Sequence, residues 1–269
     1  MNDVKFQDFV RERGQQLYRP MPWREHLDPY WILISELMLQ QTQVDRMRPK
    51  FDAFIGEFPD VAALAAADQS AVTKAWQGLG YNRRALYVAR AARMIMNEFG
   101  GKVPSTPEDL VRLPGVGPNT AGAVAAYAYN QPVLFVETNV RTVYFHHFFA
   151  GEAEITDQVI LEKLAQTIDT KNPREFYWAL MDYGTHLKKS GVRVNHQSKH
   201  YKKQSKLQGS LREMRGLILK HLTTHDVARE DELRAVFCGD LRFEAALLGL
   251  QKDGFLEVRG GEVHLTKAA

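Results

Sequence analysis

Apolar residues recur at helical spacing along most of the first 170 residues of the chain. Residues 29–39 are apolar on nearly every side, as expected of a helix buried in an all-α core. Gly and Pro residues separate this segment from further amphipathic runs. We expect helices in these runs, at residues 61–67, 70–77, 84–98, 107–112, 119–128, 139–149 and 157–168. The pattern therefore predicts an all-α fold for this part of the chain.

The pattern changes toward the C-terminal end. Helical spacing recurs there in three short segments, at residues 211–222, 230–237 and 242–252. Residues 255–265 then alternate apolar and polar side chains about Gly260-Gly261, which predicts a β-hairpin. Three helices and a hairpin predict a small winged-helix-like α+β module over residues 211–269. Such modules often bind DNA, but this one is nearly neutral, so docking of a partner or internal packing is an equally good interpretation.

The composition is that of a globular protein. The chain has 269 residues, of which 45% are hydrophobic and 25% charged, enough for one large domain or two smaller ones. No apolar run approaches the ~18 residues of a membrane span, and the first five residues lack a signal-peptide pattern, so we expect a cytoplasmic protein without a membrane partner. Cys238 is the only cysteine, which excludes an intrachain disulfide framework, a Cys-rich zinc site and a Cys-ligated iron–sulfur cluster.

The positive charge is concentrated in one short segment. Residues 183–206 contain seven Lys or Arg and no Asp or Glu, whereas the chain as a whole has a net charge of only +3. This segment also contains His186, His196, His200 and Tyr201. It could be a solvated linker, or a strip that contacts phosphates and releases their counterions.

Chemistry-bearing motifs begin with a glycine turn at residues 113–121 (Leu-Pro-Gly-Val-Gly-Pro-Asn-Thr-Ala). Gly115 and Gly117 let the backbone turn tightly and bring amide groups close to an anion at the start of the next helix. Four further motifs flank it: Met-Pro-Trp-Arg at 21–24, Ser-Glu-Leu-Met-Leu-Gln-Gln-Thr-Gln-Val at 35–44, Trp-Gln-Gly-Leu-Gly-Tyr at 76–81 and Val-Glu-Thr-Asn-Val-Arg at 136–141. In this order, the chain from about residue 20 to 185 resembles the helix-hairpin-helix DNA glycosylases, and among them the MutY-type adenine glycosylases.

The resemblance implies a two-lobed helix-hairpin-helix domain over residues 1–187, with a base pocket in the cleft between the lobes. The partner would be double-stranded DNA with a mismatched or oxidised base pair. The duplex would be bent and the target nucleotide rotated into the pocket. The hairpin amides, with or without a bound monovalent cation, would hold a backbone phosphate. We expect a nucleoid-associated monomer.

The resemblance assigns the catalytic groups to Glu36, Glu137 and Asn139. Glu36 would protonate the leaving adenine, because burial in an apolar helix favours a neutral carboxyl. Asn139 would position water or Glu36. Glu137 would stabilise the sugar cation, but the family carries aspartate at this position. The pocket is then re-spaced for the longer side chain, or the enzyme is slower, or it acts on another base; we favour the first.

Asn119 bears on the reaction class. Related bifunctional enzymes such as endonuclease III have lysine here, and its amine attacks the sugar and leads to strand cleavage. Asparagine cannot do this, so the resemblance implies a monofunctional glycosylase without strong AP-lyase activity, unless a nearby lysine substitutes.

The resemblance also assigns residues that contact the base and the DNA. Arg24, Leu39, Asn119 and Asp182 match positions of the base pocket, although Arg24 or Asp182 could instead form an ion pair between the lobes. Gln41, Thr42 and Tyr81 match positions that fill the space left by the flipped base or contact its partner, although Tyr81 could simply cap a pair of helices. The expected DNA contacts are completed by Gly115, Gly117, Lys188, Lys189, Lys199, Lys202 and Lys203.

Two departures from the family change this picture. Residues 188–210 replace the four-cysteine loop that holds a [4Fe–4S] cluster, so we expect no iron–sulfur cluster and no metal, with the basic residues taking over its electrostatic role. Residues 211–269 are too few for the Nudix-like domain that recognises 8-oxoguanine. The leading hypothesis is a base excision repair glycosylase that removes adenine opposite 8-oxoguanine or guanine. The alternatives are a thymine or uracil mismatch glycosylase, and a catalytically silent lesion-binding protein.

Overall fold

The computed structural model describes residues 3–199, 201, 205–225 and 227–267, which form two compact units. Unit 1 comprises Met1–Glu36, Pro104–Arg112 and Val116–Lys203, and unit 2 comprises Leu37–Val103, Leu113–Gly115 and Gln204–Ala269.

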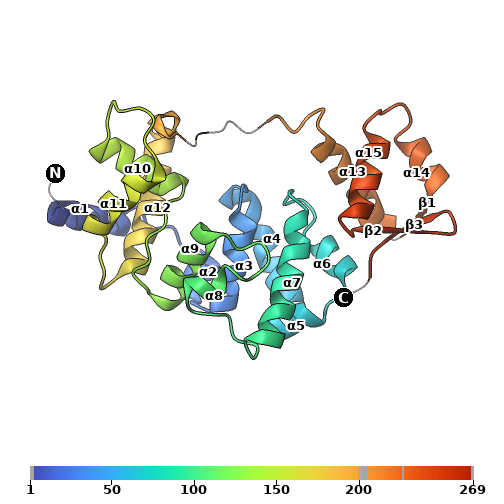
Figure 1. The fold of residues 1–269 in the computed structure, drawn as a ribbon, viewed down its shortest axis with the longest axis horizontal. Coiled ribbons are helices and arrows are strands. Elements are labelled where there is room, and N and C mark those ends of the chain that lie inside the picture. The colour runs from blue at the N-terminus through green and yellow to red at the C-terminus, as the bar shows by residue number, and fades with distance from the viewer. Residues whose placement is uncertain (1–2, 200, 202–204, 226, 268–269) are drawn as a thin grey trace. The chain divides into compact units, whose positions relative to one another are not determined.

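Unit 1 is built around one long helix, α12 (Pro173–Lys189), which packs against α1 (Asp3–Leu17), α9 (Pro118–Tyr129) and α10 (Thr138–Phe148) (Figure 1). The approach of α1 to α12 is close because Gly14 faces Ala179: a Cβ on residue 14 would lie 2.6 Å from the Ala179 Cβ. The unit is completed by α2 (Pro22–Glu25), the first turns of α3 (Pro29–Leu39), α8 (Pro107–Leu110), α11 (Asp157–Thr167) and the 3-10 helix η1 (Asn195–Gln197).

The first part of unit 2 is a helical lobe centred on α7 (Arg83–Glu98). Its apolar face packs against α5 (Val61–Ala66) and α6 (Gln69–Ala75), and α4 (Val44–Glu57) packs against α6. Asp60 and Asp68 cap α5 and α6, because each carboxylate accepts a backbone N–H from the first turn of its helix, at 2.8 Å.

The second part of unit 2 is an α+β module. It contains α13 (Leu211–His225), β1 (Val227–Arg229), α14 (Glu230–Val236), α15 (Phe243–Lys252), β2 (Leu256–Arg259) and β3 (Glu262–Leu265). The three strands form an antiparallel sheet in the order β1-β3-β2. Gly260 and Gly261 both have positive φ, as the two-residue turn between β2 and β3 requires. This order of elements is typical of a winged helix, which confirms that prediction.

The module is packed directly onto the α6–α7 lobe. Leu86 of α7 belongs to the same buried apolar cluster as Leu219, Leu250 and Leu265 of the module. The module and the lobe therefore share one core.

The predicted helices are confirmed. The sequence pattern does not predict the helices α1, α2, α4 and α12, the 3-10 helix η1 or the strand β1. No helix of the described residues is long and apolar enough to span a membrane. The boundaries of the three predicted parts stay a prediction. Lys188 and Lys189, which belong to the predicted basic segment of residues 188–210, form part of the last turn of α12.

Candidate active site

Glu36 lies in α3, the helix that the sequence predicts to be buried on nearly every side. Asp28 accepts the backbone N–H of Tyr30 at 2.7 Å and so fixes the start of the helix, and the flanking Ser35 and Leu37 are fully buried. Burial of the carboxyl raises the pKa of Glu36 to about 8; the nearby Glu137 charge adds to this, and Arg24 opposes it. A carboxyl with this pKa is largely protonated at neutral pH.

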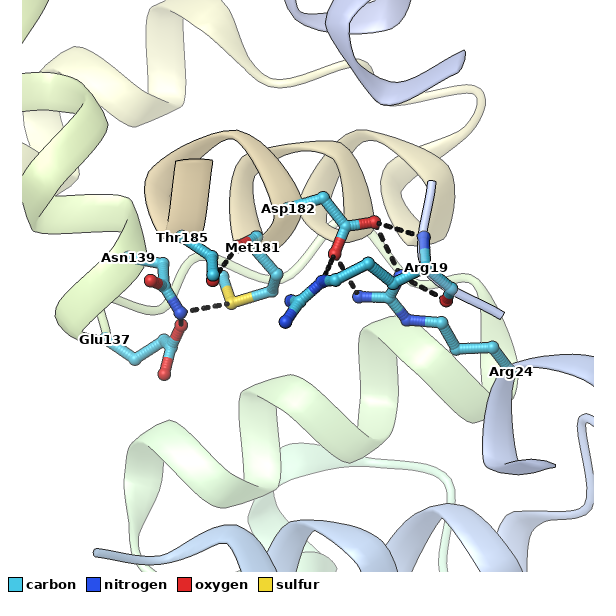
Figure 2. A network of polar contacts seen from close by, with 7 residues as sticks. All are labelled: Arg19, Arg24, Glu137, Asn139, Met181, Asp182 and Thr185. Atoms are coloured by element: carbon cyan, nitrogen blue, oxygen red, sulfur yellow. Dashed lines mark hydrogen bonds and ion pairs between the residues drawn. The ribbon is translucent and has the colours of Figure 1, made fainter. Parts of the chain in front are cut away.

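Glu137 is the N-cap residue of α10 and follows the buried Phe135 and Val136. Its Oε1 accepts a hydrogen bond from Asn139 Nδ2 at 3.1 Å (Figure 2). Burial raises the pKa of Glu137, while this hydrogen bond and the charges of Lys188 and Arg141 oppose the rise. Glu137 therefore has a hydrogen-bond donor and two cations that favour its charged form, whereas the pKa of Glu36 is lowered only by the charge of Arg24.

A third acidic group, Tyr127 of α9, shares this environment. Burial raises the pKa of its phenol well above the usual value, and the charges of Glu36 and Glu137 raise it further. Three acidic groups from three segments are thus close enough to influence one another. Two carboxyls whose environments differ in this way can act as acid and as anion in a single reaction.

Asn139 connects Glu137 to α12. Its Nδ2 also lies 3.6 Å from the Met181 sulfur (Figure 2). Its Oδ1 is buried and accepts no hydrogen bond from the described residues, so it can accept one from a water or a substrate hydroxyl. Gly184 of α12 makes this placement possible, because a Cβ there would lie 2.7 Å from the Asn139 carbonyl oxygen.

Arg24 and Asp182 form a buried ion pair, with 6% and 2% of their surfaces exposed. The Arg24 guanidinium donates to both Asp182 carboxylate oxygens, at 2.7 and 3.2 Å. Arg19, which sequence reasoning did not single out, donates to the same carboxylate through Nε at 2.6 Å (Figure 2). The Arg24 guanidinium also lies 5.4 Å from the Trp178 ring centre. The two predicted residues are therefore brought together, and the pair lies within unit 1.

The glycine turn leads into α9. Gly115 has φ +82°, and a Cβ there would lie 2.8 Å from the Tyr87 Cβ, so both backbone conformation and packing require glycine. Gly117 is the exposed N-cap of α9, and a Cβ there would meet no atom within 4 Å. Asn119, in the first turn, is exposed, and its side-chain oxygen accepts the Val136 N–H at 3.4 Å. The N-terminus of α9 thus presents an accessible positive dipole end.

The predicted DNA-contact loops of unit 2 surround a buried arginine. Leu39 ends α3 with its side chain partly exposed, and Gln41 (φ +56°) and Tyr81 (φ +47°) lie in the two loops. Arg84, only 5% exposed, lies between these loops. Its guanidinium donates at 2.7–3.3 Å to Thr42 Oγ1 and to the backbone oxygens of Leu37, Met38, Gln40, Leu79 and Gly80.

Sequence reasoning missed Arg84, although a signal was present. Arg84 stands in register with the apolar face of its helix, four residues before Val88, which is buried. A charge on an apolar helix face has to be compensated. Here the partners are neutral oxygens, and burial lowers the pKa of Arg84 to about 10, so it remains a cation.

The basic segment is partly folded. Ile155 pairs with Ser198 in an isolated β-bridge, and Gln197 Nε2 donates to the backbone oxygens of Phe149 (3.1 Å) and Glu152 (2.7 Å). Lys189 and Lys199 are exposed. Lys188 is half-buried, and its pKa is lowered by that burial and partly restored by the charge of Glu137. Lys202 and Lys203 lie outside the described residues.

No group of three or more His, Cys, Asp or Glu that could hold a metal occurs in the part of the chain that the structure describes.

Comparison with known proteins bears on the family. The model of the HhH-GPD superfamily base excision DNA repair proteins matches residues 34–169. The adenine DNA glycosylase of Mycolicibacterium smegmatis is 45% identical over 126 residues, which are 46% of this chain and 43% of that protein. The human adenine DNA glycosylase is 33% identical over 178 residues, 62% of this chain and 33% of that protein. The chain thus spans less than half the length of these curated relatives.

Solved structures show the same fold. A thermostable thymine-DNA glycosylase matches with a TM-score of 0.61 and 26% identity, over 68% of this chain and 85% of that one. A complex of endonuclease III with DNA matches with a TM-score of 0.54 and 16% identity, over 67% and 85%. These likenesses confirm the predicted helix-hairpin-helix glycosylase fold and the resemblance to adenine glycosylases. The chain belongs to the HhH-GPD superfamily of base excision DNA repair proteins.

Proposed function

We propose that this protein is a monofunctional DNA glycosylase that removes adenine mispaired with 8-oxoguanine or guanine from duplex DNA. The observation that carries the proposal is the pair of carboxyls in unit 1. Burial raises the pKa of Glu36 to about 8, whereas the rise in the pKa of Glu137 is opposed by the hydrogen bond from Asn139 and by nearby cations. Similarity to adenine glycosylases supports adenine as the base.

In the proposed reaction, the neutral carboxyl of Glu36 donates its proton to a ring nitrogen of the flipped adenine. The bond between base and sugar then breaks, its electron pair leaves with the base, and the sugar becomes a cation. The Glu137 carboxylate stabilises this cation. A water that donates to Asn139 Oδ1 attacks the sugar, and its released proton returns to Glu36. The products are free adenine and an abasic site.

The longer side chain at position 137 is accommodated by its surroundings in this proposal. Asn139 Nδ2 holds the Glu137 carboxylate, and Gly184 allows Asn139 to lie against α12. These contacts support a pocket re-spaced for glutamate. Glu137→Asp should then move the carboxylate away from Asn139 and lower the rate of base release by about 10- to 100-fold.

The absence of strand cleavage follows from the residue at position 119. The amide of Asn119 is not a nucleophile and accepts a backbone hydrogen bond from Val136. Lys188 is the amine whose charge couples to Glu137, so any residual AP-lyase activity should depend on it.

The DNA contacts are assigned in the proposal as the sequence predicts them. Gln41, Thr42 and Tyr81 would contact the duplex at the target pair, with Arg24, Leu39, Asn119 and Asp182 around the flipped base. Gly115, Gly117 and the basic residues Lys188, Lys189, Lys199, Lys202 and Lys203 would contact the backbone. The single cysteine supports a protein that works without an iron–sulfur cluster. In the proposal, the protein acts as a monomer on the nucleoid in the cytoplasm.

The test is single-turnover base release from duplexes with adenine opposite 8-oxoguanine, adenine opposite guanine, and thymine or uracil opposite guanine. Each reaction is read with and without hot alkali, which cleaves abasic sites. We expect adenine release that requires alkali for strand cleavage. Glu36→Gln should lose about 10²- to 10⁴-fold of the rate and keep its affinity for DNA. Glu57→Gln, at an exposed position of α4, is the matched control and should retain the rate.

Other results would replace the proposal. Release of thymine or uracil without adenine would assign the mismatch activity, which the match to a thymine-DNA glycosylase favours as the second candidate. If the protein releases no base from any duplex and Glu137→Asp restores base release, the protein is a lesion-binding protein.

A further inference from the structure

Tyr81 is held by a residue of the C-terminal module. Arg212, in the first turn of α13, donates from Nη1 to the Tyr81 hydroxyl at 2.8 Å, and its guanidinium lies 5.0 Å from the ring centre. The two residues are 131 positions apart in the sequence. The module therefore reaches the loop in which the sequence predicts a DNA-contact residue.

The same ring lies near a second guanidinium. Arg84, from α7, lies 5.7 Å from the ring centre of Tyr81 and hydrogen-bonds the backbone of the residues just before it. The backbone of Tyr81 has φ +47°, a conformation that a non-glycine residue keeps only where its surroundings hold it. Two cations from two elements thus fix both the loop and the ring.

The position of Arg212 is itself determined by the docking of the module. Asp253, at the end of α15, pairs with Arg83 of α7 at 2.9 Å and with Arg215 of α13, one helical turn beyond Arg212. Gln69 of α6 donates to the Gly254 carbonyl oxygen. Together with the shared apolar cluster around Leu86, these contacts hold α13 against the lobe.

Arg212 differs from its neighbours in having only neutral partners. Arg83 and Arg215 share the Asp253 carboxylate, whereas Arg212 forms no ion pair with a carboxylate among the described residues. Its Nη2 donates to the Ser205 carbonyl oxygen at 3.2 Å, at the C-terminal end of the predicted basic segment. Its charge is thus left uncompensated beside Tyr81 and the basic segment, as a DNA-facing role requires.

We propose that Arg212 is a positioning residue that orients the Tyr81 ring for insertion at the target base pair, so that the winged-helix module is a built-in part of the DNA-reading surface. The inference rests on the proposed function, since it takes Tyr81 to be a residue that enters the duplex. A planar guanidinium that stacks on a ring and bonds its hydroxyl restricts the ring before DNA binds, which lowers the entropy lost on insertion.

The test is a double-mutant cycle of Arg212→Met and Tyr81→Ala. Affinity is measured for two duplexes, one with a non-hydrolysable 2′-fluoro-adenosine opposite 8-oxoguanine and one with the normal adenine–thymine pair. With Tyr81 present, Arg212→Met should reduce the preference for the lesion duplex by about 5- to 20-fold. In the Tyr81→Ala background the same change should alter the preference by less than about 2-fold.

Two matched variants separate orientation from charge and from stability. Arg212→Lys keeps the charge but not the planar stacking, and should lose most of the same preference. Arg234→Met removes an arginine of the same module whose partners are Glu230 and Glu244, and should leave the preference unchanged. Tyr81→Phe removes only the hydroxyl that Arg212 bonds and hardly changes the size of the side chain. It replaces Arg212→Met in the test if that variant is unstable. Tyr81→Phe should lower the preference for the lesion duplex by about 2- to 5-fold.

The inference is overturned if Arg212→Met has the same effect with and without Tyr81, because Arg212 then only attracts DNA. It is also overturned if Arg212→Met and Tyr81→Phe both leave the preference unchanged. Failure of the proposed function looks different. The wild-type protein would then release no adenine from the cleavable duplex, while the binding cycle would still report on Tyr81 and Arg212.

Discussion

Among the described residues, each unit buries one arginine, and the two are compensated in different ways. Arg24 in unit 1 is paired with the buried carboxylate of Asp182. Arg84 in unit 2 has no acidic partner among the described residues and donates instead to backbone oxygens at the end of α3 and in the loop before Tyr81. In the first arrangement a buried carboxylate offsets the charge of the arginine, and in the second no carboxylate of the described residues does so.

The difference matches what each unit has to do in the proposed function. Glu36 must keep its proton near neutral pH, and an unpaired arginine beside it would lower its pKa. Pairing Arg24 with Asp182 limits that effect. The loops of unit 2 carry Gln41, Thr42 and Tyr81, which would meet the polyanionic DNA, and there an uncompensated cation is favourable. The buried arginine beside the candidate acid is thus paired with a carboxylate, and the buried arginine in the loops that would meet DNA donates to backbone oxygens.

Arg84→Met should have the largest effect, because it leaves several backbone oxygens buried without a donor. We expect the free energy of unfolding to fall by about 3–5 kcal/mol in a denaturant titration. Arg83→Met, the adjacent residue with an exposed side chain, is the control and should lose no more than about 1 kcal/mol. Equal losses for the two variants would mean that the carbonyl contacts of Arg84 contribute little.

Glu36→Gln should stabilise the protein as the pH rises. The pKa of Glu36 is raised from the usual 4.5 to about 8, so between these values the native state binds more protons than the unfolded state, and the free energy of unfolding decreases with increasing pH. Glutamine does not titrate and avoids this loss. Thermal unfolding should show no difference near pH 4.5, whereas at pH 8.5 the variant should be more stable by about 4 kcal/mol and have a higher Tm. A difference that does not depend on pH would contradict the raised pKa.

Asp182→Asn should cause the smallest change in the rate of base release among these variants, and it tests the pairing of Arg24 directly. Without the carboxylate, the positive charge of Arg24 would act more strongly on Glu36 and lower its pKa. In the wild type, the rate of base release should fall as the pH rises through about 8, and in the variant this fall should occur about one pH unit lower. Asp169→Asn, which removes an acid paired with Arg11 in the same unit, should leave the pH of this fall unchanged.

The sequence indicates the candidate catalytic groups through local motifs, whereas several elements of the framework around them leave little local signal. Glu36, Glu137 and Asn139 stand in motifs of local residues, and the structure places all three in unit 1. The helix α4 escaped prediction because it contains Pro49 in its interior, and α1 because only Phe6 and Val10 of its 15 residues are buried. The strand β1 is three residues long, too short to show alternation.

Contacts between residues far apart in the sequence could not be predicted, for a different reason. Arg84 could have been noticed as a charge on an apolar helix face, but nothing local to Arg212 indicates Tyr81 as its partner. That contact exists because Leu86 and Asp253 dock the module on α7. A contact that arises from tertiary packing leaves no periodic pattern in the sequence, so periodicity cannot predict it.

The sharing of Leu86 between α7 and the module has a consequence for how the chain folds. Gln69 and Gly254, whose contact joins the lobe to the module, are 185 residues apart, so the module cannot complete its docking until nearly the whole chain has been synthesised. Contacts of such sequence separation slow folding, and until they form Leu86 remains open to solvent. The nascent α6–α7 lobe therefore exposes an apolar side chain until the module has docked.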